Sequence, residues 1–114
     1  MPPSLFVSNT DSLGEQIQRA FPGARVVKTL HTVTAAVMVD PAIVRNGEHT
    51  MFLAGDDAEA KAEVTTLLTD GFGWKDLLDL GGISSARATE MALPLWLAIE
   101  MKSGDPVYNF AIVR

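Results

Sequence analysis

The chain of 114 residues contains no cysteine, which excludes disulfide frameworks, thiolate zinc sites and cysteine nucleophiles. It also lacks an excess of basic charge, because 9 lysines and arginines stand against 14 aspartates and glutamates. We therefore expect no nucleic-acid partner, since proteins that bind phosphate backbones usually present a basic stripe. The longest apolar run, residues 91–99, is interrupted by Pro94 and falls short of the roughly 20 residues that cross a bilayer.

The composition that is present indicates an ordered domain. Hydrophobic residues make up 47% of the chain, which excludes disorder, and the length suits one hydrophobic core. No linker, repeat or low-complexity tract divides the sequence, so residues 1–114 are expected to form a single domain. The first residues show neither a basic n-region nor a cleavage signal, so secretion is not indicated and we expect a soluble, cytoplasmic protein.

Turn signals divide the chain into alternating strands and helices. Helical patterns cover residues 12–21, 56–70 and 84–102, with a short helical turn at 35–39 and a bend at Pro94. Such alternation indicates βαβ crossovers and an α/β fold. The expected sheet is mainly parallel or mixed, is covered by helices, and has about five strands, at residues 5–7, 25–30, 50–54, 74–80 and 107–113.

The first helix has a clear start signal and a clear apolar face. Ser12 and Glu15 have the spacing of a capping box, in which the hydroxyl and the carboxylate satisfy free amides reciprocally. Leu13, Ile17 and Phe21 recur at four-residue spacing, which places them on one side of the helix. In the same way, Asp56 with Glu59 three residues later predicts the cap of the second long helix.

Two histidines are candidates for chemistry. His31 follows the strand 25–30, and open α/β sheets bind their ligands at the carboxyl ends of strands. It could orient a polar group or transfer a proton, or simply bond a backbone carbonyl. His49 lies in a polar loop and is expected to be exposed. Their spacing supports no metal site.

The segment from Gly81 to Glu90 offers two further candidates. Free amides in the turn at 81–85, assisted by Arg87, could hold an anion, although an ordinary turn with a serine cap is the simpler interpretation. Glu90 could form an exposed ion pair with Arg87 at three-residue spacing, or point inward and act as a general acid or base.

The last helix is apolar on almost all sides, which is more apolar surface than one helix face can present. We expect part of it to meet a second subunit, so a homodimer is predicted, or alternatively an apolar ligand. Its apolar residues are Met91, Leu93, Leu95, Trp96, Leu97, Ile99 and Met101.

Several segments occur together in a familiar order and spacing: 12–16, 22–28, 30–32, 54–57, 79–81 and 83–87, followed by Glu90. From about residue 8 onward they resemble the carboxyl-terminal half of coenzyme F420-dependent NADP oxidoreductases. The resemblance implies a truncated Rossmann-type half, without the amino-terminal glycine-rich turn that holds the nicotinamide cofactor. It also implies that residues 31–33 lie near the hydride-transfer centre and that residues 90–96 belong to the helix closing the site.

We favour a cofactor-independent enzyme descended from such a reductase, because nothing in this chain seats a pyrophosphate in the usual way. It would bind a largely apolar, natural-product-like substrate such as a polyketide and promote cyclisation, including pericyclic ring closure, isomerisation or dehydration. His31 and Glu90 are the predicted catalytic residues. The predicted substrate pocket comprises Thr32, Val33, Met38, Met91, Leu95, Trp96 and Tyr108.

Two alternatives remain open on the sequence. The chain could be a reductase fragment or subunit that binds NADP and F420 together with a separate amino-terminal partner. It could also be a non-catalytic module that binds a ligand or another protein.

Overall fold

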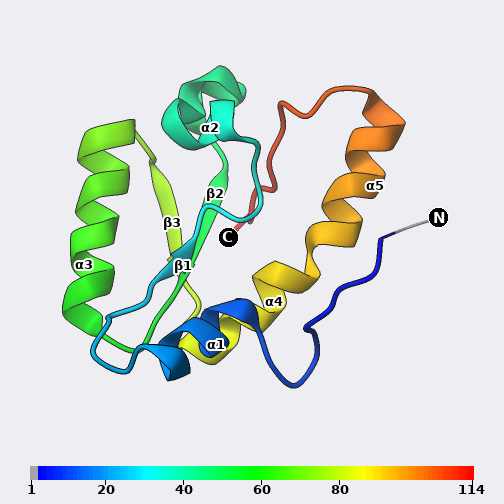
Figure 1. Cartoon of the computed structure of the whole chain (residues 1–114). Helices are drawn as coiled ribbons and strands as arrows, with labels where there is room; N and C mark the ends of the chain where they lie inside the picture. The colour runs from blue at the N-terminus through cyan, green and yellow to red at the C-terminus, as the bar shows by residue number, and fades with distance from the viewer. Residues whose placement is uncertain (1–2) are drawn as a thin grey trace.

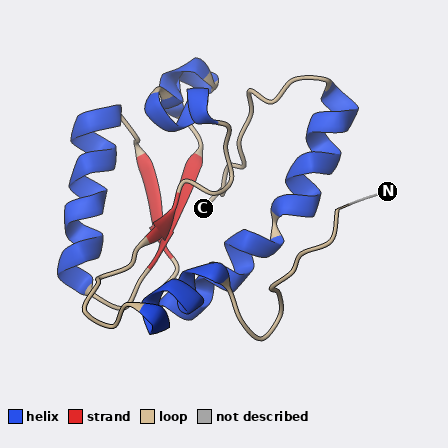
Figure 2. Cartoon of the chain, viewed as in Figure 1, coloured by secondary structure: helices blue, strands red, loops and turns tan. Residues whose placement is uncertain are grey.

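A small mixed sheet forms the centre of the molecule in the computed structural model, which describes residues 3–114. Its strands are β1 (Lys28–Thr29), β2 (Thr50–Ala54) and β3 (Asp76–Asp79), in the order β1-β2-β3. β1 is antiparallel to β2, whereas β3 is parallel to it. The sheet is open, and β1 and β3 are its edges. Figure 2 shows the strands between the helices.

Helices lie on both sides of this sheet (Figure 1). The crossover from β2 to β3 passes through α3, which lies along one side, while α4 and α5 lie on the other and α1 crosses beside α4. Parallel neighbours need such a crossover, so the α/β class is confirmed for this part of the chain. The helices are α1 (Leu13–Ala20), α2 (Ala35–Val39), α3 (Ala58–Thr66), α4 (Ala86–Met91) and α5 (Leu93–Ser103).

The core lies on one face of the sheet. Met51 and Leu53 alternate with Phe52 along β2, so the first two enter the core while Phe52 points to the opposite face. Leu77 of β3 is paired with Met51 and packs against the same core. The other buried members of this core are Val33, Val37, Leu68 and Trp74.

The prediction of about five strands is wrong for the described residues, which form three. Residues 107–113 run past the start of β2 without forming a ladder. The Thr50 amide donates to the Phe110 carbonyl at 3.0 Å, but the Ile112 amide donates to the Thr50 side-chain hydroxyl at 2.9 Å. A side chain thus takes the bond that a strand partner would have made. The sheet is mixed, which is the alternative that the sequence left open, because β1 runs antiparallel to its neighbour.

The predicted Ser12 cap is confirmed, but the orientation of α1 is unexpected. The Ser12 hydroxyl accepts from the Glu15 amide at 3.1 Å. The apolar residues of the helix face outward, and Leu13, Ile17 and Phe21 are 51%, 42% and 64% exposed. The buried side of α1 contains Gly14 and Glu15 instead.

The expected bent helix over residues 84–102 is divided into α4 and α5 at Ala92. Pro94 lies in the first turn of α5, where its missing amide donor costs no helical hydrogen bond. α5 ends at Gly104, whose φ of 74° is the left-handed conformation that glycine adopts easily. No residue of α5 is buried, and its pairing with a second copy stays a prediction. Within residues 3–114, no helix is long and apolar enough to cross a membrane.

Candidate functional site

An open cavity of about 430 Å³ lies on the second face of the sheet. Phe52 and Leu80 form its floor, and residues of α4, α5 and the segment 110–112 form its sides. Its wall is almost entirely apolar. Thr32 and Thr89 also line it, and their hydroxyls donate within the chain to Asn109 Oδ1 at 3.4 Å and to the Ala86 carbonyl at 3.2 Å. A cavity of this volume and lining is typical of a small-molecule site with a few orienting polar groups.

The carboxyl-terminal segment forms one side of the cavity and is tied to the sheet by further bonds besides those of Phe110 and Ile112 with Thr50. Asn109 Nδ2 donates to the Thr50 carbonyl at 2.8 Å. Arg114 donates twice to the Asp76 carboxylate, at 2.7 and 3.1 Å. These guanidinium bonds hold the pKa of Asp76 below its ordinary value. The segment is therefore a positioned wall even though it has no secondary structure.

His49 is buried, which contradicts the expectation that it is exposed. Its Nδ1 accepts from Asn109 Nδ2 at 2.8 Å, and its Nε2 lies 2.8 Å from the Pro41 carbonyl, to which it donates. The ring packs edge-on against Trp74 with the centroids 5.1 Å apart. Both ring nitrogens are thus used internally, and His49 supports the wall through Asn109.

The structure brings only part of the predicted pocket together. Among the nine predicted site residues, Thr32 and Leu95 line the cavity. Val33 belongs to the hydrophobic core, and Met38 packs against that core. Met91 is partly exposed, and its sulfur accepts from the Asn9 amide at 3.4 Å. A binding role for the residues outside the cavity wall stays a prediction.

Trp96 and Tyr108 stack on each other beyond the cavity, with ring centroids 5.1 Å apart. The Tyr108 hydroxyl donates to the Trp96 carbonyl, which joins α5 to the carboxyl-terminal segment. Burial, reinforced by the charge of Glu100, raises the pKa of Tyr108. The two aromatic residues thus stabilise the segment from its outer end.

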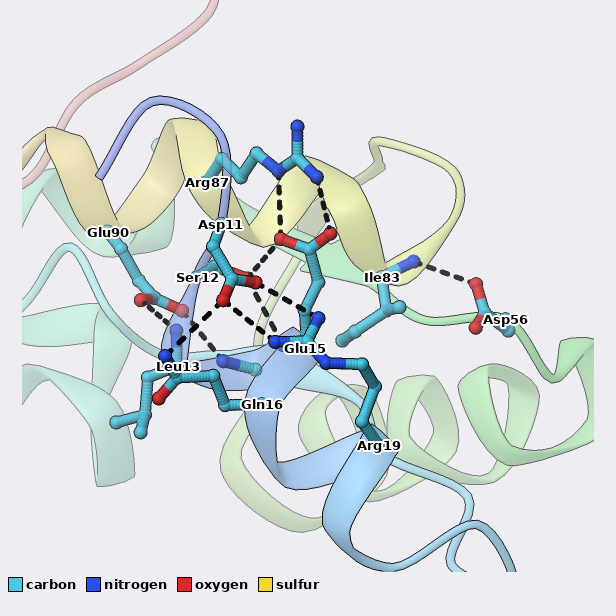
Figure 3. A network of polar contacts seen from close by, with 11 residues as sticks. Asp11, Ser12, Leu13, Glu15, Gln16, Arg19, Asp56, Ile83, Arg87 and Glu90 are labelled. Carbon is cyan, nitrogen blue, oxygen red and sulfur yellow. Dashed lines mark hydrogen bonds and ion pairs between the residues drawn. The ribbon is translucent and has the colours of Figure 1, made fainter. Parts of the chain in front are cut away.

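Glu90 is held by the start of α1 (Figure 3). Its carboxylate accepts from the Leu13 amide at 2.7 Å and from the Gly14 amide at 3.1 Å, and lies 3.4 Å from Lys28 Nζ. The first amides of a helix have no partner within the helix, and its positive end favours an anion. Glu90 therefore caps a helix 76 residues away in the sequence, and a catalytic role for it stays a prediction.

The ion pair expected between Arg87 and Glu90 is replaced by one between Arg87 and Glu15. Arg87 donates to the two oxygens of Glu15 at 2.8 and 2.7 Å, and these bonds hold the pKa of Glu15 below its ordinary value. The Glu15 carboxylate also accepts from the Ser12 hydroxyl at 2.8 Å. It therefore does not reach back to an amide as a capping box would require.

The turn at residues 81–85 offers no free anion site at its start. The Ile83 amide donates to Asp56 Oδ1 at 2.9 Å, and the Gly81 amide donates to Asp79 Oδ1 at 2.8 Å. Asp57, not Asp56, caps α3 by accepting from the Ala60 amide at 2.8 Å. The segment is therefore an ordinary turn, in which Asp56 accepts from the Ile83 amide in place of the expected serine.

His31 has a buried ring nitrogen with no hydrogen-bond partner among the described residues, Nε2. It follows Leu30, whose φ of 62° is uncommon for a bulky residue and costs conformational energy. Burial, with a further effect of the Lys28 charge, lowers the pKa of His31. A neutral imidazole with an unpartnered nitrogen is suited to exchange a hydrogen bond with a polar group of a ligand.

We predict that the pKa of His31, followed by NMR, lies below its ordinary value and rises when Lys28 is replaced by methionine. The matched change Lys75→Met should leave it unchanged. Because the unfolded chain takes up this proton at about pH 6.5, the contribution of His31 to stability is full above that pH and is lost as the pH falls toward the folded pKa. An unchanged His31 titration in Lys28→Met would contradict the packing described above.

Comparison with known proteins gives one informative likeness. No protein-family model matches the chain, and no curated protein matches it. A solved structure from Arthrobacter sp. FB24, described as a "putative f420 dependent nadp-reductase", matches 100% of this chain with a TM-score of 0.96 and 54% sequence identity. The chain resembles one half of an F420-dependent NADP reductase.

The likeness covers 51% of the Arthrobacter protein, so the chain spans about half the length of that relative. This agrees with the predicted resemblance to the carboxyl-terminal half of the family. The predictions of a cyclase and of a polyketide substrate find no support in this comparison. Sequence reasoning identified His31 and Thr32 as candidates but missed the partnership of Glu90 with α1, because no local spacing signals a contact across 76 residues.

Proposed function

We propose that this chain provides one wall of an F420- and NADP-dependent reductase site, in partnership with a second half that holds the nucleotide. The observation that supports the proposal is 54% identity and a TM-score of 0.96 over the full chain to the Arthrobacter protein. The sequence contains no glycine-rich G-x-G-x-x-G turn, which is the usual seat of a pyrophosphate. The dinucleotide is therefore assigned to the other half.

The residues that line the cavity are better suited to bind the ring of a cofactor than its phosphates. The cavity is apolar and of a size that takes a ring system, and Thr32 and Thr89 supply hydroxyls at its wall. His31 is not part of the cavity wall but adjoins Thr32 in the chain, and its buried Nε2 has no hydrogen-bond partner among the described residues, so a polar ring substituent that reached it would complete its hydrogen bonding. When bound, F420 exchanges a hydride with the nicotinamide, which is chemistry that belongs to the cofactors.

The chain's own contribution is to orient and to exclude water. The Thr32 hydroxyl donates to Asn109 Oδ1 at 3.4 Å, so toward a ligand it would act as an acceptor, and Phe52, Leu80 and Leu95 remove water from around a ring. His31 stays neutral because its pKa is lowered, so it exchanges a hydrogen bond without adding a charge. Such positioning matters because hydride transfer depends closely on the alignment of its two partners.

The test is a fluorescence titration of the isolated chain with F420 and, separately, with NADPH. We expect F420 to bind and NADPH to bind more weakly, since the chain has no phosphate seat. Replacing His31 with alanine should weaken F420 binding about tenfold, the loss expected for one buried hydrogen bond. Circular dichroism checks that the variant is folded. Failure of both cofactors to bind, even with the complementary half of the relative present, would remove the proposal.

A cofactor-independent enzyme acting on an apolar substrate is the second candidate. It is supported by the cavity alone, whose apolar wall could restrict a flexible molecule to a reactive conformer without a cofactor. The same titration separates the two candidates, because micromolar binding of F420 or NADPH favours the reductase half.

A further inference from the structure

We propose that α1 and the free edge of β1 form the docking surface for the complementary half of the reductase, a proposal that rests on the proposed function. The outer face of α1 is defined here by Leu13, Ile17 and Phe21. The free edge is the side of β1 (Lys28–Thr29) that faces away from β2. The occupant is the segment that corresponds to the unmatched part of the Arthrobacter protein.

The outer face of α1 is apolar and exposed although the helix is well formed. Its three residues are 42–64% exposed, whereas amphipathic helices normally turn such a stripe toward a core. A stripe of this kind on a soluble domain indicates an interaction surface.

Three contacts prevent α1 from rotating to bury this face within the chain. The Glu90 carboxylate holds the first two amides of the helix, and Arg87 holds Glu15 (Figure 3). At Gly14 the helices approach so closely that an added Cβ would lie 3.2 Å from the Ala86 Cβ. The outward orientation is therefore fixed by specific packing, and the apolar face is presented to a partner.

The free edge of β1 is the second part of the proposed surface. β1 has a single neighbour, β2, so its other side has unpaired backbone groups that can receive a further strand. Gln18 holds α1 to the segment before β1, because its side chain accepts from the Val26 amide at 3.1 Å and donates to the Ala24 carbonyl at 2.7 Å. Gln18 thus connects α1 to the segment that leads into β1.

The length of the relative indicates what covers this surface. The Arthrobacter protein contains the same fold within a chain of which only 51% is matched, so a second half is present beside it. A continuing α/β sheet needs both features at once, because its next strand pairs with the edge while its layers pack on the adjoining helix.

The test uses a fused polypeptide in which the unmatched part of the Arthrobacter protein is joined to this chain in the order of that protein. A protease site lies at the junction, and no cofactor is added. After cleavage, size-exclusion chromatography should show the two parts eluting together. Ile17→Glu should separate them, with at least a 100-fold weaker association. Leu67→Glu is the matched control, because Leu67 is 56% exposed on the distant α3 side.

Three results of this experiment would contradict the proposed docking surface. The proposal is overturned if the wild-type parts separate after cleavage, or if Ile17→Glu behaves like Leu67→Glu. It is also overturned if Ile17→Glu abolishes only self-association of this chain, since the occupant is then a second copy. Circular dichroism of the lone Ile17→Glu chain must match the wild type. If the two parts associate but bind neither F420 nor NADPH, the docking surface is supported and the proposed function is contradicted. If the parts bind cofactor but Ile17→Glu does not weaken their association, the proposed function is supported and the docking surface is contradicted.

Discussion

Replacing Glu90 with alanine is expected to lower the free energy of unfolding by about 3 kcal/mol, the usual cost of removing one partner of a buried charged cluster. The change strips acceptors from the Leu13 and Gly14 amides and leaves Lys28, whose side chain is 19% exposed, without its carboxylate. A buried donor left without an acceptor has lost its hydrogen bonds to water and gains none in return. The expected loss of stability is therefore larger than the net contribution of the two hydrogen bonds to folding.

Urea unfolding of the variant, followed by circular dichroism, measures this effect. Glu90→Gln should lose less than alanine, because its amide oxygen still accepts one of the two backbone bonds. Glu63→Ala is the control, since Glu63 is 72% exposed and lies 3.9 Å from Arg25, and should change stability by less than about 0.5 kcal/mol. A Glu90→Ala protein as stable as the wild type would show that the contact with α1 does not form.

This expectation affects how activity data on Glu90 are interpreted. A loss of activity in Glu90→Ala follows from displacement of α1 and α4 even if the carboxylate never meets a ligand. α4 contributes Ala88 and Thr89 to the cavity wall, so a shift of this helix changes the pocket directly. A catalytic role therefore requires an effect in Glu90→Gln that exceeds its loss of stability.

Local signals in the sequence predicted much of the fold. The β2 segment 50–54, the short helix 35–39 and the Ser12 cap all appear as expected, because each depends on residues within one turn or one strand. Residues 107–113 show why such signals fail elsewhere. Their β-branched and aromatic composition favours a strand, yet the Thr50 hydroxyl takes the hydrogen bond on which a ladder would depend.

The candidate site was less predictable, because its decisive contacts join distant residues. Polar neighbours suggested an exposed His49, but its partner Asn109 lies 60 residues away. Amphipathicity identified the apolar face of α1 correctly, and it could not reveal that nothing described in this chain covers that face. A periodic pattern predicts which side of a helix is apolar. It does not predict whether that side packs against the same chain or against another polypeptide.

Filling the cavity with Ala88→Trp should weaken F420 binding by roughly 100-fold, which corresponds to about 2.7 kcal/mol. Ala88 is exposed and lines the cavity from α4, so an indole at this position occupies the space of a ligand ring without entering the core. The protein itself should unfold at about the wild-type denaturant concentration, because a helix tolerates tryptophan at an exposed position with a loss of only some tenths of a kcal/mol.

Ala62→Trp provides the matched control, since Ala62 is an exposed alanine in the middle of α3, on the other side of the sheet. Fluorescence titration of F420 should give a wild-type affinity for this variant and a severe loss for Ala88→Trp. Equal affinities in the two variants would place the ring outside the cavity, and the orphaned nitrogen of His31 would then mark a separate contact. A loss of affinity in Ala88→Trp but not in His31→Ala would keep the ring in the cavity and remove His31 from its binding, so the pair of variants locates the ligand even when one expectation fails.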